Sequence, residues 1–258
     1  MPGYLEDLRR LTWKLGNASS TPPRLPDLSW VLRAVSDSKP PRDQLPTKLT
    51  FVCLSYRGYW RSRGRPTENG INLDAEAGAR WIAQTHRRMY PDGTQSPEPA
   101  LLVWGQSIGS GFATNLAASH RLPSGLPVKG LILETPFLNT RAMLETLYPQ
   151  KWLPYKYLWP FLWNHLDSWA NFAHIAGASE TTAADLPAVF ILEAERDELV
   201  PREHGEELYQ RCKDLGFDVE KASAPVAYHS EAIARGGGKK LVAEAILRLV
   251  RKWSTKNV

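Results

Sequence analysis

Residues 100–118, ALLVWGQSIGSGFATNLAA, constrain the fold of this chain more than any other segment. A short apolar run is followed by Gly105-Gln106-Ser107-Ile108-Gly109 and then by a longer run of small residues. This pattern predicts a buried strand, a sharp turn at Ser107 and a helix, with the glycines preventing collisions across the turn. The alternatives are an ordinary glycine-rich turn or a phosphate-binding loop, although no lysine follows as a P-loop requires.

The rest of the chain alternates between predicted strands and predicted helices. Apolar and β-branched runs predict strands at residues 49–55, 128–134, 187–193 and 219–226. Amphipathic patterns predict helices at residues 4–14, 28–35, 71–89, 203–215 and 239–253, with a loop at residues 22–26. This alternation is typical of an α/β fold, with a mainly parallel sheet and helices on both faces. We therefore expect a single domain over residues 1–258.

Ser107 needs a base that accepts its proton and an acid that orients that base. Asp197 directly follows a predicted strand, at the rim where open α/β sheets carry their sites. Glu195 and Glu198 flank it and are the competing carboxylates. Among the six histidines, His229 alone lies between the last predicted strand and the final helix. The order of Ser107, Asp197 and His229 predicts a catalytic triad.

The negative charge that develops on an attacked carbonyl oxygen needs backbone N–H donors. One predicted donor is the amide of Ile108, which directly follows the nucleophile. The second normally comes from a loop after an earlier strand. The segment Gly16-Asn17-Ala18 is the only candidate for that loop, so Asn17 is the expected second donor.

Composition narrows the setting and the partners. The formal net charge is +5, and no apolar run approaches the roughly 18 residues of a membrane span. Residues 1–14 do not resemble a secretory signal. Cys53 and Cys212 lack metal-binding spacing, and Cys53 is predicted to be a buried thiol in a reducing compartment. We expect no cofactor, metal or nucleic acid, and a cytoplasmic location or one at the surface of an intracellular membrane.

Several motifs together resemble one family. They are SYRGYWRSRGRPTENGINLDAEAG, GQSIGSG, LILETPF and ERDELVP, and they occur with the late His229. The chain resembles the membrane-anchored, bud-emergence-type subfamily of α/β-hydrolases in fungi and animals, which includes lysophospholipid lipases and protein depalmitoylases. The resemblance implies that Ser107 is the nucleophile, Asp197 the orienting acid and His229 the base. It also implies that residues 137–180, an aromatic insertion, form a cap over the pocket.

Two features depart from that family. The family has His-Gly-Asn-Ala at the oxyanion loop, and here Leu15 stands at the position of the histidine. The family also has an apolar strand before this loop, whereas residues 5–14, LEDLRRLTWK, are charged and read as a helix. We therefore expect the first strands of the fold to be missing and residues 16–18 to be poorly anchored.

The predicted function is that of a serine hydrolase acting on small-molecule or lipid substrates. It cleaves esters or thioesters of apolar acyl groups through an acyl-enzyme intermediate and requires no cofactor. The alternative is a catalytically impaired hydrolase fold that serves as a binding or scaffold protein, and peptidase activity is a third option. The arginines at positions 57, 61, 63 and 65 either attract an anionic head group or belong to a solvated loop. The tryptophans of the insertion either line an acyl pocket, contact a membrane or pack on the sheet.

Overall fold

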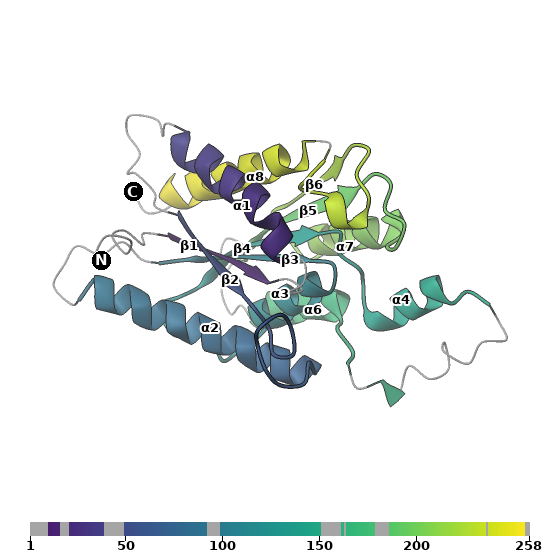
Figure 1. Ribbon diagram of the computed structural model, residues 1–258, viewed down its shortest axis with the longest axis horizontal. Coiled ribbons are helices and arrows are strands. Elements are labelled where there is room, and N and C mark those ends of the chain that lie inside the picture. The colour runs from purple at the N-terminus through teal and green to yellow at the C-terminus, as the bar shows by residue number, and fades with distance from the viewer. Residues whose placement is uncertain are drawn as a thin grey trace.

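A six-stranded parallel sheet forms the centre of the protein (Figure 1). The computed structural model describes residues 10–15, 21–38, 49–91, 99–150, 161–162, 164–178, 186–235 and 237–255. The strands are β1 (Arg10–Leu15), β2 (Leu49–Leu54), β3 (Leu101–Gln106), β4 (Val128–Glu134), β5 (Ala188–Ala194) and β6 (Val219–Ala224). Their order in the sheet is β2-β1-β3-β4-β5-β6, and every neighbouring pair is parallel. The predicted α/β class with a parallel sheet is confirmed.

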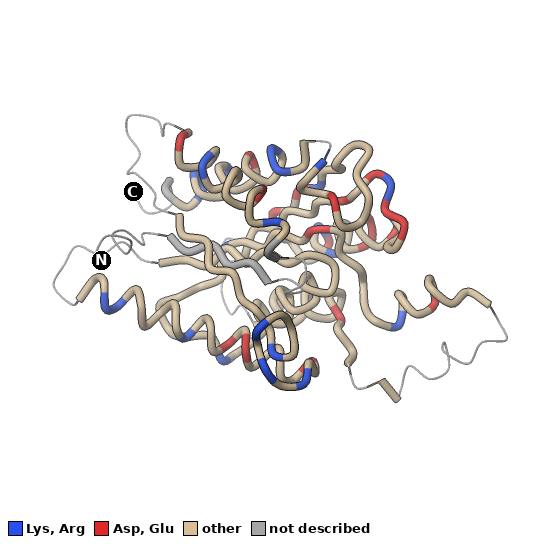
Figure 2. The backbone as a smooth tube through the Cα atoms, in the orientation of Figure 1, with Lys and Arg blue, Asp and Glu red and all other residues tan. Residues whose placement is uncertain are grey.

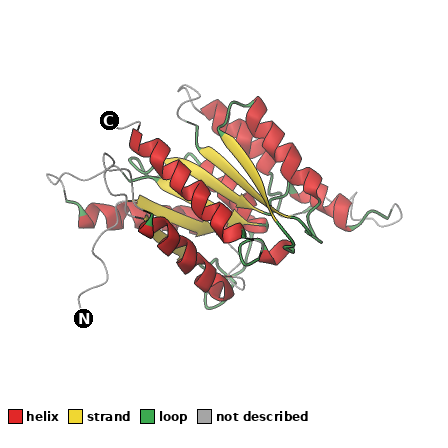
Figure 3. Cartoon of the chain, turned by 90° about the horizontal axis from the view of Figure 1, so that it is seen from above, coloured by secondary structure: helices red, strands yellow, loops and turns green. Residues whose placement is uncertain are grey.

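Helices cover both faces of this sheet (Figure 3). They are α1 (Thr21–Asp37), α2 (Glu68–Met89), α3 (Ile108–Ala117), α4 (Thr140–Leu147), α6 (Ser168–Ala178), α7 (Arg202–Asp214), α8 (Gly238–Thr255) and the short 3₁₀ helix η3 (His229–Glu231). One hydrophobic core lies between the sheet and α1 with α8. The other lies between the sheet and α2, α3, α6 and α7.

The central strand β3 supplies both cores. Leu101 and Val103 belong to the core on the α2 and α3 side, whereas Leu102 and Trp104 belong to the core on the α1 and α8 side. All six residues of β3 are buried. A continuous apolar run at this position therefore reflects burial on both faces of a parallel sheet. The strand holds the Ser107 turn at the centre of the molecule.

The N-terminal segment differs from its prediction. Residues 10–14 were expected within a helix, but Arg10–Leu15 forms β1, paired with β2 on one side and β3 on the other. The helical reading counted leucines spaced by three along residues 5–11. The sequence also alternates polar and apolar residues from Arg10 to Leu15, which is the period of a strand. Because β1 pairs with β2 and with β3, this segment forms a strand rather than a helix.

Two smaller predictions are also wrong. Residues 22–26, predicted as a loop, form the beginning of α1. Pro22 and Pro23 lie in the first turn of the helix, where the missing N–H of proline has no helical acceptor. Pro26 lies inside the helix, so one helical N–H is absent there. Cys53 is exposed rather than buried, because it lies on edge strand β2. On its face of the sheet, the core contacts only the earlier residues Leu49 and Phe51.

Candidate active site

Ser107 occupies a strained turn between β3 and α3. Its backbone has φ 51° and ψ −119°, a combination that a residue with a side chain rarely adopts. The Ser107 amide donates a 2.8 Å hydrogen bond to the carbonyl of Glu134 at the end of the neighbouring strand β4. A Cβ atom on Gly105 would lie 2.1 Å from the carbonyl oxygen of Gly109. The glycine before the serine is therefore required by the close approach of the backbone, as the sequence predicts.

His229 lies between Ser107 and Asp197. Its Nε2 is 2.8 Å from the Ser107 Oγ, and its Nδ1 is 2.9 Å from both carboxylate oxygens of Asp197. A carboxylate only accepts hydrogen bonds, so Nδ1 carries the proton and Nε2 of the neutral ring accepts from the serine hydroxyl. The structure thus brings together the three residues that the sequence singled out. Each follows the carboxyl end of a strand, β3, β5 or β6.

The backbone fixes Asp197 in this position. Its Oδ1 accepts hydrogen bonds from the amides of Leu199 at 3.0 Å and Val200 at 2.8 Å. Of the two competing carboxylates, Glu195 accepts from the amide of Val226, and Glu198 accepts from the amide of His229 at 3.0 Å. Of these three acids, only Asp197 is hydrogen-bonded to the imidazole. The support that Glu198 gives to the His229 backbone was missed, because chain order does not reveal such a contact.

The structure describes only one of the two predicted oxyanion donors, the amide of Ile108. Ile108 is the first residue of α3, and the first N–H groups of a helix have no acceptor within the helix. Asn17 lies outside the described residues. The strand before it, β1, ends at Leu15, which pairs with Gly105, close to Ser107 in the chain. We expected residues 16–18 to be poorly anchored because a helix was predicted before them. That predicted helix is wrong, since β1 directly precedes these residues.

A buried ion pair lies behind the serine turn. The guanidinium of Arg24 in α1 donates to both oxygens of the fully buried Glu134, at 2.7 Å to Oε2. The Trp104 indole also donates to this carboxylate, at 3.1 Å. Because the Glu134 carbonyl accepts from the Ser107 amide, one residue joins α1, β3 and β4 to the turn.

The described part of the insertion contains helices α4 and α6, and α6 packs beside α3. Asn171 of α6 donates to Thr114 at 3.0 Å and also to Asn115, and Phe172 is completely buried. At the start of the insertion, the Leu138 amide donates to Nδ1 of His204 at 3.4 Å. Burial lowers the pKa of His204, which favours the neutral ring that can accept this bond. Of the aromatics predicted to form a cap, Phe161 and Trp169 are described and partly or largely exposed. Five others lie outside the described residues: Trp152, Tyr155, Tyr157, Trp159 and Trp163.

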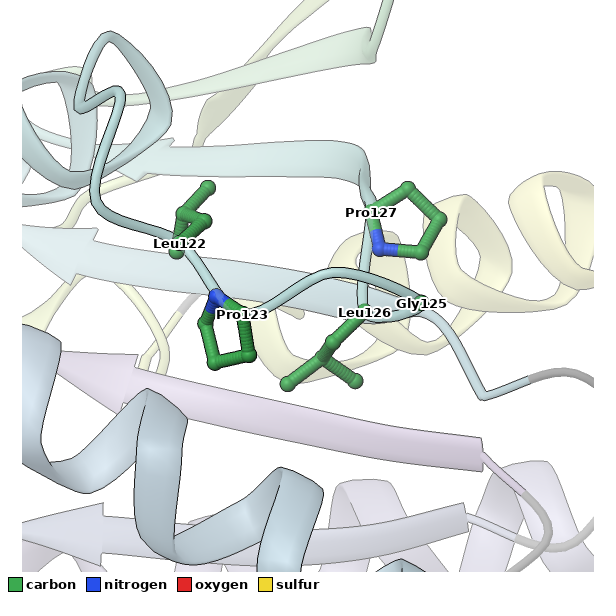
Figure 4. A pocket seen from close by; sticks show the side chains of 5 residues that line it. All are labelled: Leu122, Pro123, Gly125, Leu126 and Pro127. Atoms are coloured by element: carbon green, nitrogen blue, oxygen red, sulfur yellow. The ribbon is translucent and has the colours of Figure 1, made fainter.

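A separate pocket of about 410 Å³ lies at the opposite edge of the sheet from Ser107 (Figure 4). Leu122, Pro123, Gly125, Leu126 and Pro127 line it, just before β4 begins. None of these residues has a titratable side chain, so the pocket offers no group for acid–base catalysis. Over the residues that the structure describes, no helix is long and apolar enough for a membrane span. The same residues contain no cluster of histidine, cysteine and acidic side chains suited to a metal ion.

Comparison with solved structures identifies the fold. An esterase from Pyrococcus furiosus, Pf2001, superposes with a TM-score of 0.60 and 16% identity over 95% of this chain and 82% of its own. A fungal esterase from Rhizomucor miehei superposes with a TM-score of 0.63 and 16% identity over 100% of this chain and 78% of its own. The chain has the α/β-hydrolase fold. At these identities the likeness concerns the fold alone.

Curated relatives of this chain include a lipase by name. A protein from Danio rerio, lysophosphatidylserine lipase ABHD12, is 38% identical over 160 residues, which make up 61% of this chain and 38% of the relative. The human protein ABHD12B is 31% identical over 170 residues, which make up 66% of this chain and 43% of the relative. The alignments thus cover less than half of the length of these relatives. No family profile matches the chain.

Proposed function

We propose that this α/β-hydrolase is a serine hydrolase that cleaves esters or thioesters of apolar acyl groups. The observation that carries the proposal is the hydrogen-bonded series from Asp197 through His229 to Ser107, with contacts of 2.8–2.9 Å. A serine hydroxyl bonded to a neutral imidazole, which is itself held by a carboxylate, is the arrangement that activates serine for acyl transfer. The lipases and esterases among the relatives support hydrolysis of an ester.

The proposed reaction has two steps. The Ser107 Oγ attacks the substrate carbonyl carbon while His229 Nε2 accepts the hydroxyl proton, and Asp197 stabilises the imidazolium that forms. His229 then protonates the departing alcohol or thiol, which leaves an acyl-serine. In the second step His229 accepts a proton from water, the resulting hydroxide attacks the acyl-serine, and the acid departs as Ser107 regains its proton. The Ile108 and Asn17 amides are the proposed donors to the oxyanion in both steps.

The proposed substrates are lysophospholipids. The support is the printed name of the Danio rerio relative, a lysophosphatidylserine lipase that matches 61% of this chain. Acyl thioesters use the same chemistry and belong to the same proposal, and residues 137–180 are the proposed cap that selects the acyl chain. Contact with a membrane surface would accompany such substrates.

A fluorophosphonate probe tests the serine, because it reacts only with an activated nucleophile. The native protein is expected to be labelled and to hydrolyse a short p-nitrophenyl ester and lysophosphatidylserine, whereas Ser107→Ala abolishes all three readings. Ser119→Ala, at the other end of α3, is the matched control and should keep them. A folded native protein that takes up no probe would contradict the proposal and favour the binding or scaffold alternative.

A further inference from the structure

The loop between β2 and α2, residues 55–67, combines exposed aromatic and basic groups. Because all strands are parallel, this loop lies at the same sheet edge as Ser107. At its base, the buried Tyr56 ring packs against Phe112 of α3, with ring centroids 5.5 Å apart. In Figure 2 the loop carries a group of blue basic residues just before α2. A ligand bound to this loop would therefore be close to the active-site edge.

The conformation of the loop is fixed from within. The Ser62 hydroxyl donates to the Ser55 carbonyl at 3.0 Å, and the Arg57 guanidinium donates to Asp74 at 2.7 Å. Gly58 has φ +77°, and a Cβ atom there would lie 2.5 Å from Pro66. These contacts thus hold the tip of the loop in one conformation.

Trp60 lies at this tip with its ring in the solvent. It is 68% exposed, and its φ of 49° is unfavourable for a residue with a side chain. The guanidinium of Arg61 lies over the ring, 5.5 Å from its centroid. A large aromatic held outward at the expense of backbone strain is a marker of a functional surface.

The neighbouring charges are positive and have no acidic partner within the described part of the chain. Arg61, Arg63 and Arg65 are exposed, and none forms an ion pair with any residue that the structure describes. The two nearest acids in the chain are already occupied. Asp74 pairs with Arg57, and Glu68 accepts hydrogen bonds from the His165 amide and the Asn115 side chain. The positive charge at the tip is therefore available to an external anion.

A second exposed aromatic belongs to a neighbouring segment. Phe161 is 76% exposed and shortly precedes Asn164, whose side-chain oxygen accepts from the Glu68 amide directly after the loop. Two aromatic side chains from different parts of the chain are thus exposed on segments that meet at Glu68.

We propose that residues 58–66 dock on the surface of an anionic lipid bilayer. Trp60 enters the interfacial layer, where tryptophan is favoured, and the arginines at positions 61, 63 and 65 contact lipid phosphates. A bilayer fits better than a nucleic acid, because the basic groups form one small tip with an apolar centre rather than an extended basic stripe. Docking does not depend on catalysis, although its use in presenting lipid to Ser107 rests on the proposed function.

Vesicle co-sedimentation tests this surface. The native protein should bind vesicles of equal parts phosphatidylcholine and phosphatidylserine more tightly than vesicles of phosphatidylcholine alone, and about 0.5 M salt should weaken the difference. Replacing Arg61, Arg63 and Arg65 together with glutamine should weaken binding to the anionic vesicles on the order of 100-fold. Trp60→Gly, which relieves the unfavourable φ, should fold and should remove much of the binding that remains at high salt.

Matched controls separate docking from net charge and from catalysis. Replacing Arg33, Arg88 and Arg251 with glutamine removes the same charge from α1, α8 and the far end of α2, and should leave vesicle binding within twofold. Ser107→Ala should bind vesicles like the native protein, so a failure of hydrolysis alone would contradict the proposed function and leave docking intact. Equal binding by the native protein and the loop variant would overturn the docking proposal. Loop-dependent retention on heparin without vesicle binding would also overturn it, in favour of a general polyanion site.

Discussion

At the scale of single residues, Asp197 is distinguished from its neighbours by its contacts. Glu195, Asp197 and Glu198 follow the same strand, yet only Asp197 contacts the His229 ring, while the two glutamates accept backbone N–H groups. His229 is 7% exposed. In such a shielded position a fixed carboxylate stabilises the imidazolium more than it would in water.

Asp197→Asn should therefore lower kcat for a p-nitrophenyl ester by roughly 10⁴, because an amide can donate to Nδ1 and favour the wrong tautomer. The fold should be kept, since the amide oxygen can still accept from Leu199 and Val200. Glu195→Gln is the control and should change kcat by less than about threefold. A comparable loss in both variants would assign the orienting role elsewhere.

Gly105 gives a second residue-scale prediction. In Gly105→Ala the new Cβ would meet the Gly109 carbonyl, a backbone atom that cannot rotate away. We expect a loss of stability of about 3 kcal/mol or more, together with loss of probe labelling, because the Ser107 turn must open. Gly177→Ala is the control, since nothing lies within 4 Å of its added Cβ and α6 should gain about 0.5–1 kcal/mol. Thermal denaturation of both variants measures the contrast.

At the scale of elements, α1 is joined to the Ser107 turn by a buried charge pair. The carboxylate of Glu134 is fully buried, and Arg24 and Trp104 donate to it. Removing one member of a buried pair leaves an uncompensated charge, which costs far more than the pair itself contributes.

Arg24→Met should consequently lower the free energy of unfolding by about 3–5 kcal/mol, measured in urea. The double variant Arg24→Met with Glu134→Leu should recover part of this loss, because no charge then remains buried. Arg141→Met breaks an exposed pair with Glu145 in α4 and should cost less than about 1 kcal/mol. Equal losses in the free energy of unfolding for Arg24→Met and Arg141→Met would show that the contact between Arg24 and Glu134 does not stabilise the fold.

The start of the insertion should respond to pH through His204. Burial lowers the pKa of His204 below its usual 6.5, while Glu203 and Glu207 oppose this shift. Between the two pKa values the unfolded chain binds more protons at this site than the folded protein, so stability falls as the pH drops below 6.5. The neutral ring also accepts the Leu138 amide.

His204→Gln should therefore make stability less dependent on pH between about 7.5 and 5.5, as measured by urea denaturation. His120→Gln replaces an exposed histidine and should leave the native pH dependence unchanged. A native protein that is as stable at the lower pH as at the higher one would contradict the role of His204.

The sequence correctly predicted those elements whose apolar residues fit only one pattern, either that of a strand or that of a helix. The strand at residues 128–134 matches β4, and the helix at 203–215 nearly matches α7. Chain order and strand ends restricted the choice to Ser107, Asp197 and His229, and the structure places these three side chains in hydrogen-bond contact. The segment before Leu15 was misread because it carries two periods, and only pairing with distant β2 and β3 selects the strand. The basic loop was noticed but left open, because exposure of Trp60 is a property of the folded loop.

At the scale of the whole molecule, β1 holds the sheet together. It is the only described connection between β2 and the other strands, and the structure pairs it along its whole length with β2. Proline lacks the N–H that donates a hydrogen bond to the neighbouring strand, so a substitution to proline within β1 should be poorly tolerated.

Thr12→Pro should leave the protein largely insoluble, whereas Glu220→Pro in the edge strand β6 should fold with a lowered melting temperature. The soluble fraction after expression and thermal denaturation of the recovered protein measure the two effects. Similar solubility of both variants would mean that β1 is dispensable for the sheet.

The position of β1 between β2 and β3 also affects how the chain folds during synthesis. This strand leaves the ribosome well before its partner β3, since Leu11 pairs with Leu101. Of the described strands, only β2 can pair with β1 until then, and a two-stranded ribbon is at best marginally stable. Pairings over such long separations form slowly and leave the growing chain prone to association. The protein should thus depend on chaperones most strongly in the interval between synthesis of β1 and of β3, the strand that precedes Ser107.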